Sequence, residues 1–234
     1  MGNVPRLDEI GRLVGDPSRA AILAALMDGR AWTGRELAHF AHVSASTASS
    51  HLQQLVGGEL LSVVAQGRNR YYRIASPYVA SALESLMALA PSHAPRHPSE
   101  RRIANDMAAA RFCYDHLAGK LGVRLTDALV ARGAVAFSEG AGTLTDNGLA
   151  FFEKLGISLE PLRRIRRPMC RPCLDWSERR PHLAGITGSA LGHAALERGW
   201  VVRKRNSRAL SVTSRGAKAL KGIFGIDVVP ASEE

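Results

Sequence analysis

The chain has 234 residues, and its 31 Lys and Arg outnumber its 21 Asp and Glu, giving a formal net charge of +10. A surplus of this size favours a polyanionic partner, because Lys and Arg displace condensed counterions from phosphates. No apolar run approaches the roughly 20 residues that cross a bilayer. The N-terminus also lacks the apolar core of a signal peptide. We therefore expect a cytoplasmic protein without a membrane partner.

A proline-rich segment at residues 91–98 divides the chain. Proline removes backbone donors and restricts its neighbours, and the segment has no apolar periodicity, as is typical of a linker. We predict a DNA-binding domain at 1–90, a linker at 91–98 and an effector or dimerisation domain at 99–234. The expected fold class is mainly α with small β-hairpins (α+β).

The first domain is predicted from caps and periodicity. Asp16, Thr33 and Ser44 are side chains that cap helices well, and Pro17 suits the first turn of a helix. The expected elements, in chain order, are helices at 7–14, 17–28, 34–41 and 45–56, β-runs at 60–65 and 71–75 joined by a basic loop at 66–70, and a helix at 77–89. This order is the winged helix-turn-helix layout.

The fourth predicted helix has two distinct faces. Ala45, Ala48, Leu52 and Leu55 follow helical spacing and are expected to face the core. The opposite side carries short hydroxyls and amides, and residues 41–58 contain no carboxylate to repel phosphate. Ser and Thr are poor helix formers, and we interpret their presence on this face as a surface that fits close to DNA. The alternative interpretation is a helix that is rich in Ser by chance.

We predict that this helix and the hairpin tip bind DNA. Hydroxyls bond phosphates or base edges, glutamine pairs with adenine in the major groove, and tip arginines reach phosphates or the minor groove. The alternative for the tip is an ordinary solvated turn. The candidate DNA-binding residues are Ser44, Ser46, Thr47, Ser49, Ser50, His51, Gln53, Gln54, Arg68, Asn69 and Arg70.

These segments resemble a known family. Asp16-Pro-Ser-Arg19, Val43-Ser-Ala-Ser-Thr-Ala-Ser-Ser-His-Leu52 and Gly67-Arg-Asn-Arg-Tyr-Tyr-Arg73 are similar to the ArsR-type (arsenic-repressor-like) winged-helix transcriptional regulators, over roughly residues 5–90. The resemblance implies a homodimer that binds a palindromic operator and represses until an unknown inducer arrives. The family's metal-sensing members carry ligands in regions that here contain Trp32-Thr-Gly-Arg-Glu-Leu-Ala38 and Tyr78-Val-Ala-Ser-Ala-Leu-Glu84, neither of which offers a ligand set.

The second half contains an internal repeat. Residues 128–157 and 195–226 each show a helix ended by Gly, a β-hairpin, a Thr-x-x-Gly pattern and a second helix. We predict two degenerate winged-helix-like repeats that pack together. The second hairpin, 203–208, is basic, so a further DNA contact is the alternative to the effector or dimerisation role that we favour.

The three cysteines are candidate sensor thiols. Cys170 and Cys173 form a Cys-x-x-Cys pair that can close a disulfide or chelate a soft metal ion, and Cys113-x-x-His116 offers further ligands. Buried thiols without a role and a structural metal are the alternatives. We expect surrounding positive charge to lower the thiol pKa, from Arg166, Arg167, Arg171, Arg179 and Arg180.

Other histidines are expected to be hydrogen-bonded surface groups, namely His39, His42, His182 and His193. No cofactor is certain, and the metal is unknown.

The main functional hypothesis is a sequence-specific transcriptional repressor, released by an inducer or a thiol or metal signal. The alternative is a sequence-indifferent nucleoid or RNA-binding protein. A thiol enzyme is a third hypothesis, but we find no Ser/His/Asp arrangement, phosphate-binding glycine loop or His-Glu metal motif in the sequence. We therefore expect that the protein is not an enzyme.

Overall fold

The computed structural model describes residues 6–90, 98–138, 140–159, 167–205 and 207–231. The chain forms two compact units, Met1–Leu83 and Glu84–Glu234. The division falls within α5 (Pro77–Leu89), earlier than the linker that we expected. Of that linker, residues 91–97 lie outside the described residues, as does Arg166, and Pro98 is the first residue of α6.

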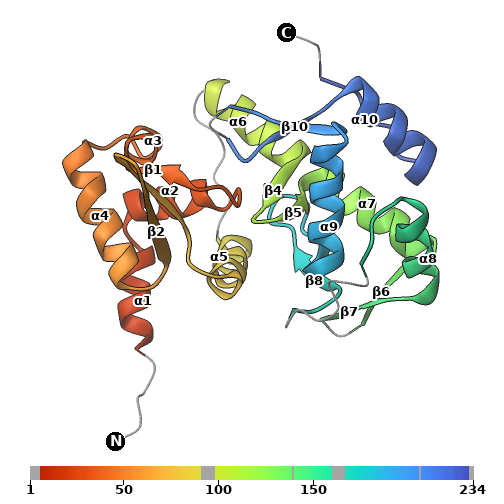
Figure 1. Ribbon diagram of the computed structural model, residues 1–234, viewed down its shortest axis with the longest axis horizontal. Coiled ribbons are helices and arrows are strands. Elements are labelled where there is room, and N and C mark those ends of the chain that lie inside the picture. Colours follow the sequence, from red (N-terminus) through yellow and green to blue (C-terminus); the bar gives the residue numbers. More distant parts are fainter. Residues whose placement is uncertain (1–5, 91–97, 139, 160–166, 206, 232–234) are drawn as a thin grey trace, which may run out of the picture. The chain divides into compact units, whose positions relative to one another are not determined.

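The first unit has the predicted winged helix-turn-helix order (Figure 1). Side-chain caps begin three of its helices: Asp16 accepts from Arg19 N, Thr33 forms a capping box with Glu36, and Ser44 accepts from Thr47 N. Its elements are α1 (Leu7–Val14), α2 (Pro17–Leu26), β1 (Trp32–Thr33), α3 (Gly34–Phe40), α4 (Ala45–Gly57), β2 (Leu61–Gln66) and β3 (Asn69–Ile74).

The wing is a hairpin within a three-stranded antiparallel sheet of order β1-β3-β2. Gln66 pairs with Asn69, so only Gly67 and Arg68 form the turn. Gly67 has φ 59°, which glycine adopts at no steric cost and which the tight turns of hairpins need. The loop is therefore shorter than predicted, because both strands extend into it. The short β1 was not predicted.

The second unit contains the same succession twice: hairpin, helix, hairpin, helix. After α6 (Pro98–Ala109), the first copy comprises β4 (Arg111–Cys113), β5 (His116–Ala118), α7 (Gly119–Ala131), β6 (Val135–Ser138), β7 (Ala141–Leu144) and α8 (Asp146–Lys154). The second comprises β8 (Arg171–Leu174), β9 (Pro181–Ala184), α9 (Gly185–Glu197), β10 (Val201–Arg203), β11 (Leu210–Val212), α10 (Ser214–Ala219) and the π-helical turn Leu220–Phe224. The predicted repeat is confirmed, and each copy begins one hairpin earlier than the sequence suggested.

The two copies pack against each other. The first copy's α7 packs on β9 of the second, and α9 packs on β5, beside which it lies in Figure 1. Isolated bridges join Arg111 to Ala209 and Cys170 to Gly142. The first hairpin of each copy, which we call its leading hairpin, therefore also contacts the second hairpin of the other copy. One hydrophobic core spans both copies, with Phe112, Leu129 and Phe152 among its fully buried members. As a result, β5 and β9 lie together at the centre.

Among the helices of the described residues, none is both long and apolar enough to span a membrane.

Candidate functional site

The polar face of α4 lies at the surface. Ala48, Leu52 and Leu55 are buried as predicted, whereas Ala45 is exposed, because it is the first residue of the helix and precedes the packed turn. His51 is only half-buried on the flank of the helix. The exposed candidates are Ser44, Ser46, Thr47, Ser49, Ser50, Gln53 and Gln54.

A buried arginine holds one end of this face. Arg19 donates to the backbone oxygens of Leu13 and Arg12 and, at 2.8 Å, to Oε1 of Gln54. Its Nη1 also lies 3.4 Å from Nδ1 of His51. The amide oxygen of Gln54 is therefore engaged within the protein, whereas Gln53 is exposed one residue earlier on α4.

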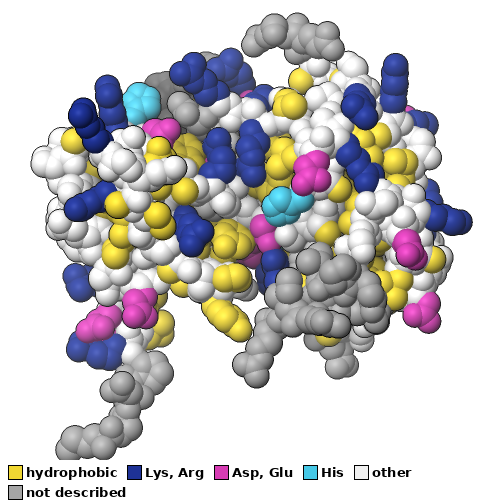
Figure 2. All heavy atoms as spheres, viewed as in Figure 1, with side chains coloured by type: hydrophobic (Ala, Val, Ile, Leu, Met, Phe, Trp, Pro, Cys, Tyr) yellow, Lys and Arg dark blue, Asp and Glu magenta, His cyan; other side chains and the backbone are white. Residues whose placement is uncertain are grey.

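The wing tip presents cations to solvent, since Arg68, Asn69 and Arg70 are all exposed. The basic hairpin of the second unit differs. Arg203 lies over the Phe112 ring, with 4.4 Å to the ring centroid, Lys204 pairs with Asp106 at 2.7 Å, and Arg208 is buried. These internal contacts favour a packing role for Arg203, Lys204 and Arg208 over a second DNA contact. Figure 2 shows Lys and Arg spread over the visible face of both units.

Cys173 lies beside Cys113 and two histidines, and not beside Cys170 as the Cys-x-x-Cys pattern predicted. Cys113, His116, Cys173 and His182 are buried, and one ligand atom from each lies within 4.8 Å of the others. Cys170 belongs to the main core and donates to Thr187 Oγ1 at 3.5 Å. Residues three apart along an extended chain point to opposite sides, so the chelating pair Cys170 and Cys173 is not formed.

Each hairpin supplies one cysteine and one histidine directly opposite it. Cys113 is the register partner of His116, and Cys173 is that of His182. The two Nε2 atoms lie 3.1 Å apart, and His182 has no exposed surface. Our expectation that His182 is a surface group was therefore wrong, while His39, His42 and His193 are exposed as expected.

An aspartate lies beside each histidine on the side away from the cluster. Asp115 Oδ1 is 3.2 Å from Nδ1 of His116, and Asp175 Oδ2 is 3.1 Å from Nδ1 of His182, although the second contact is poorly aligned for a hydrogen bond. Arginine holds both carboxylates in place, because Arg167 pairs with Asp115 and the fully buried Arg111 pairs with Asp175.

These contacts set the protonation chemistry of the cluster. A hydrogen bond with Cys173, burial and the nearby Glu84 raise the pKa of Cys113 to about 12. Burial opposes the charge of His116, yet hydrogen bonds to Asp115 and Cys113 raise its pKa to about 10.

The two aspartates respond in the opposite direction. Burial disfavours their charge, but hydrogen bonds from His116 and Arg167 hold the pKa of Asp115 below its usual range. Likewise, His182 and Arg111 hold the pKa of Asp175 below its usual range.

Positive charge does not lower the pKa of Cys170 as predicted. Burial raises the pKa of Cys170, and the arginines near it in sequence are engaged elsewhere. Arg171 pairs with Glu84, Arg179 donates to the Ala88 oxygen, and Arg180 pairs with Asp127. Sequence proximity was therefore a poor guide to the electrostatic surroundings of these thiols.

Glu84 links the cluster to α5. Its Oε2 accepts from Sγ of Cys173 at 3.3 Å and from Arg171 at 3.1 Å, and its Oε1 is 3.9 Å from Nε2 of His116. The carboxylate is buried and is compensated by Arg171. Cys173 is therefore in hydrogen-bond contact with a residue of α5.

Sequence reasoning missed the signal that pairs these hairpins. His116-Leu-Ala-Gly-Lys-Leu-Gly122 and His182-Leu-Ala-Gly-Ile-Thr-Gly188 share a His-Leu-Ala-Gly-x-x-Gly pattern. A Cβ at Gly122 would lie 2.3 Å from the Leu117 oxygen, and one at Gly188 would lie 2.2 Å from the Leu183 oxygen. The repeated glycines therefore let each helix approach the hairpin that precedes it.

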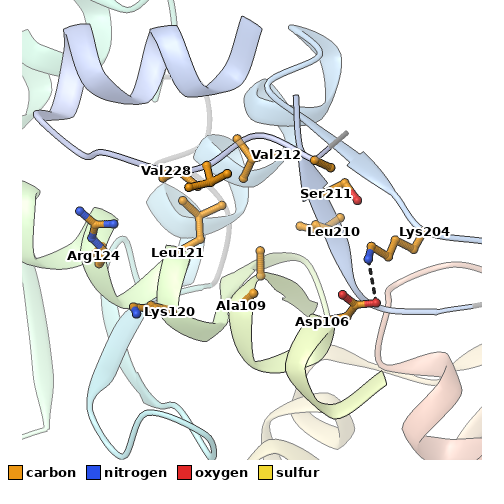
Figure 3. Close-up of a pocket in the computed structure, with 13 residues that line it drawn as sticks. Asp106, Ala109, Lys120, Leu121, Arg124, Lys204, Leu210, Ser211, Val212 and Val228 are labelled. Atoms are coloured by element: carbon orange, nitrogen blue, oxygen red, sulfur yellow. Dashed lines mark ion pairs between the residues drawn. The ribbon is translucent and has the colours of Figure 1, made fainter. Parts of the chain in front are cut away.

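A separate pocket of about 270 Å³ opens between α6, α7 and β11 (Figure 3). Its floor is apolar, including Leu121 and Val228. Lys204 at its edge is paired with Asp106, and Arg124 donates to the backbone oxygen of Asp227. Two cations of this pocket are therefore held by protein groups, and Lys120 also lines it.

The chain is similar to known transcriptional regulators. It is 42% identical over 224 residues to the HTH-type transcriptional regulator YdfF of Bacillus subtilis (strain 168), a match that covers 96% of this chain and 99% of YdfF. It is 37% identical over 81 residues to the HTH-type transcriptional regulator CmtR of Mycobacterium tuberculosis (strain ATCC 25618 / H37Rv), covering 35% of this chain and 68% of CmtR.

Among solved structures, one similar chain is the homodimeric winged helix-turn-helix DNA-binding domain of a possible ArsR-family regulator from Mycobacterium bovis. It shows 28% identity and a TM-score of 0.34, covering 36% of this chain and 76% of that one. No protein-family model matches the chain. The YdfF match extends through both units, so the C-terminal unit is shared as well. The chain therefore belongs to the HTH-type transcriptional regulators, with a C-terminal unit in addition to its winged helix-turn-helix unit.

Proposed function

We propose that the protein is an operator-specific repressor that inserts α4 into the major groove and contacts flanking phosphates with its wing. The observation that carries this proposal is the exposed face of α4, which offers hydroxyls and amides and no carboxylate. The exposed Arg68 and Arg70 provide the phosphate contacts. Phosphate contacts fix position on the duplex, whereas groups that reach base edges determine sequence preference.

We propose a homodimer as the DNA-binding form. Large apolar side chains are exposed on two helices of the winged unit, with Leu7 81% exposed and Tyr78 82% exposed, and Ile10 also at the surface. A second copy would cover apolar surface that solvent otherwise contacts. A two-fold dimer would place two α4 helices against the half-sites of a palindrome.

We further propose that the signal is a metal ion bound by the cysteines and histidines of the C-terminal unit, and that its uptake releases the operator. Support comes from the buried cluster of Cys113, His116, Cys173 and His182, whose residue types suit a soft or borderline metal ion. The contact between Cys173 and Glu84 offers a physical connection from this cluster to α5.

The test of DNA recognition uses duplexes selected from a random pool by the full-length protein, together with scrambled versions. We expect Gln53→Ala to lower the preference for selected over scrambled duplex by about 5–150-fold, corresponding to loss of ~1–3 kcal/mol of base discrimination. Arg68→Ala should weaken binding to both duplexes and reduce the salt dependence by about one phosphate contact. Fluorescence anisotropy at several salt concentrations measures both effects.

Gln54→Ala is the matched comparison, because the Gln54 oxygen is held by Arg19. We expect it to change preference less than Gln53→Ala does. If Gln53→Ala and Arg68→Ala instead weaken both duplexes equally, α4 does not recognise bases. Uniform binding of the native protein to every duplex would support the sequence-indifferent alternative.

A further inference from the structure

We infer that Cys113, His116, Cys173 and His182 form a tetrahedral zinc(II) site that joins the two repeats of the C-terminal unit. The inference deepens the proposed metal response, on which its regulatory meaning rests, by naming the ion, its tetrahedral coordination and the excluded thiol. Each repeat contributes the same pair of ligand types from the same place in its leading hairpin. The site therefore follows from the duplication of the chain.

The geometry of the cluster suits four-coordination. With metal–nitrogen bonds of ~2.0–2.1 Å, a tetrahedron separates two nitrogen ligands by roughly 3.3–3.4 Å. The Nε2 atoms of His116 and His182 are 3.1 Å apart. All four ligand atoms lie within 4.8 Å of one another, and a tetrahedral site with zinc–sulfur bonds of ~2.3 Å would place two thiolates roughly 3.8 Å apart.

The surroundings of both histidines are those of metal ligands. Histidines that bind metals donate their second ring nitrogen to a carboxylate or carbonyl, which fixes the tautomer and leaves the first nitrogen free to coordinate. Asp115 and Asp175 lie at Nδ1 of His116 and His182, so both Nε2 atoms are directed toward the cluster. Each aspartate stands two residues after the cysteine of its own hairpin.

The donor set selects the ion. Two thiolates and two imidazoles in a tetrahedron favour zinc, whereas carboxylate and water donors favour magnesium, calcium or manganese. On binding, each thiol and the protonated Nε2 of His116 lose a proton to the buffer, and the two thiolates balance the charge of one Zn²⁺. Burial of the four ligands keeps water away from the ion, as in structural rather than catalytic zinc sites.

The inference also states which residues do not bind the ion. Cys170 lies in the main core against Thr187, and His193 is exposed on α9, where its Nδ1 is 2.8 Å from the Ser189 oxygen. These two residues supply matched controls for the cysteine and histidine ligands. Cys170 and Cys173 are only three positions apart, yet substitution of Cys173 should abolish metal binding and substitution of Cys170 should not.

The experiment titrates the full-length, chelator-treated and reduced protein with Co²⁺, followed by displacement with Zn²⁺. We expect one Co²⁺ per chain, with the intense visible bands of tetrahedral cobalt and a thiolate charge-transfer band. Cys113→Ser and Cys173→Ser should each lose the stoichiometric tetrahedral spectrum, and Cys170→Ser should retain it. Asp115→Asn, a positioning variant, should keep the spectrum and weaken affinity by about 10–100-fold.

Several results would overturn the inference: weak octahedral cobalt bands, an unchanged spectrum in the Cys113→Ser/Cys173→Ser double variant, or loss of the spectrum in Cys170→Ser alone. If the cysteine variants do not fold by circular dichroism, His182→Asn and His193→Asn decide between the outcomes. The inference requires that only His182→Asn alters the cobalt spectrum.

Operator binding separates this inference from the proposed function. Tetrahedral binding without any change in operator affinity would support the zinc site and contradict metal-triggered release. Conversely, metal-triggered release that persists in the Cys113→Ser/Cys173→Ser variant would support the regulatory proposal and overturn this site.

Discussion

Cys170 and Cys173 show how burial and strand direction separate two nearby thiols. Burial raises the pKa of Cys170, so its thiolate fraction at neutral pH is lower than that of a free cysteine. We predict that Cys170 resists alkylation in the folded protein at pH 7–8 and reacts fully in denaturant. Peptide mass spectrometry after timed treatment with iodoacetamide measures this difference. Rapid labelling of Cys170 in the folded protein would restore the thiol-switch hypothesis.

At the scale of residues, sequence predicted what local geometry determines. The caps at Asp16, Thr33 and Ser44 depend on neighbours within three positions, and all three are confirmed. The contact of Arg19 with Gln54 joins residues 35 positions apart, so no local pattern predicts it. The burial of His182 likewise depends on the hairpin that brings it opposite Cys173.

Among the elements, α5 contains the division between the two units, and its Glu84 is a neighbour of the cluster within the second unit. Glu84 accepts a hydrogen bond from the Cys173 thiol. Metal binding would replace that thiol by a thiolate, which cannot donate, and the contact with α5 would be lost. Arg171 would remain to balance the charge of Glu84.

We therefore predict that Glu84→Gln retains zinc stoichiometry but loses most of the zinc-dependent change in operator affinity. The amide can donate to the thiolate, so the contact with α5 survives metal binding. A coupling of about 5–150-fold, typical of allosteric proteins, should fall toward unity. Anisotropy with and without zinc measures the change, and Glu153→Gln on the exposed face of α8 is the control. Full coupling in Glu84→Gln would assign the connection to another contact.

Element prediction succeeded where periodicity extends over several turns. The bounds of α1 and α5 match the expectation, and the buried stripe of α4 does so from Ala48 onward. The hairpins β4–β5 and β8–β9 were missed, because their strands of three or four residues are too short for an alternating pattern. Comparison of the two copies was the available signal, through the repeated His-Leu-Ala-Gly-x-x-Gly.

For the whole molecule, net charge indicated a nucleic-acid partner without locating it. Residues 1–83 contain eight Lys and Arg against six Asp and Glu, so most of the surplus lies in the C-terminal unit. Several cations there form internal ion pairs, such as Lys204 with Asp106 and Arg167 with Asp115. The DNA-binding proposal therefore depends on the composition of one helix face more than on total charge.

Zinc should stabilise only one of the two units. The four proposed ligands lie in Glu84–Glu234, so an ion bound by the folded cluster raises the free energy of unfolding of that unit and leaves Met1–Leu83 unaffected. At a free zinc concentration 100 times the dissociation constant, mass action contributes about 2.7 kcal/mol. For a unit of this size, ~1 kcal/mol shifts the midpoint by roughly 2–4 °C, so the expected increase is about 5–10 °C.

Differential scanning calorimetry of the full-length protein, with zinc and after chelation, measures this increase. We expect two transitions, of which one moves with zinc and the other does not. In Cys113→Ser/Cys173→Ser neither transition should move, whereas Cys170→Ser should respond as the native protein does. Equal shifts of both transitions would mean that zinc binds outside the cluster or that the two units unfold together. A shift that persists in Cys113→Ser/Cys173→Ser would assign the stabilisation to zinc bound outside the cluster.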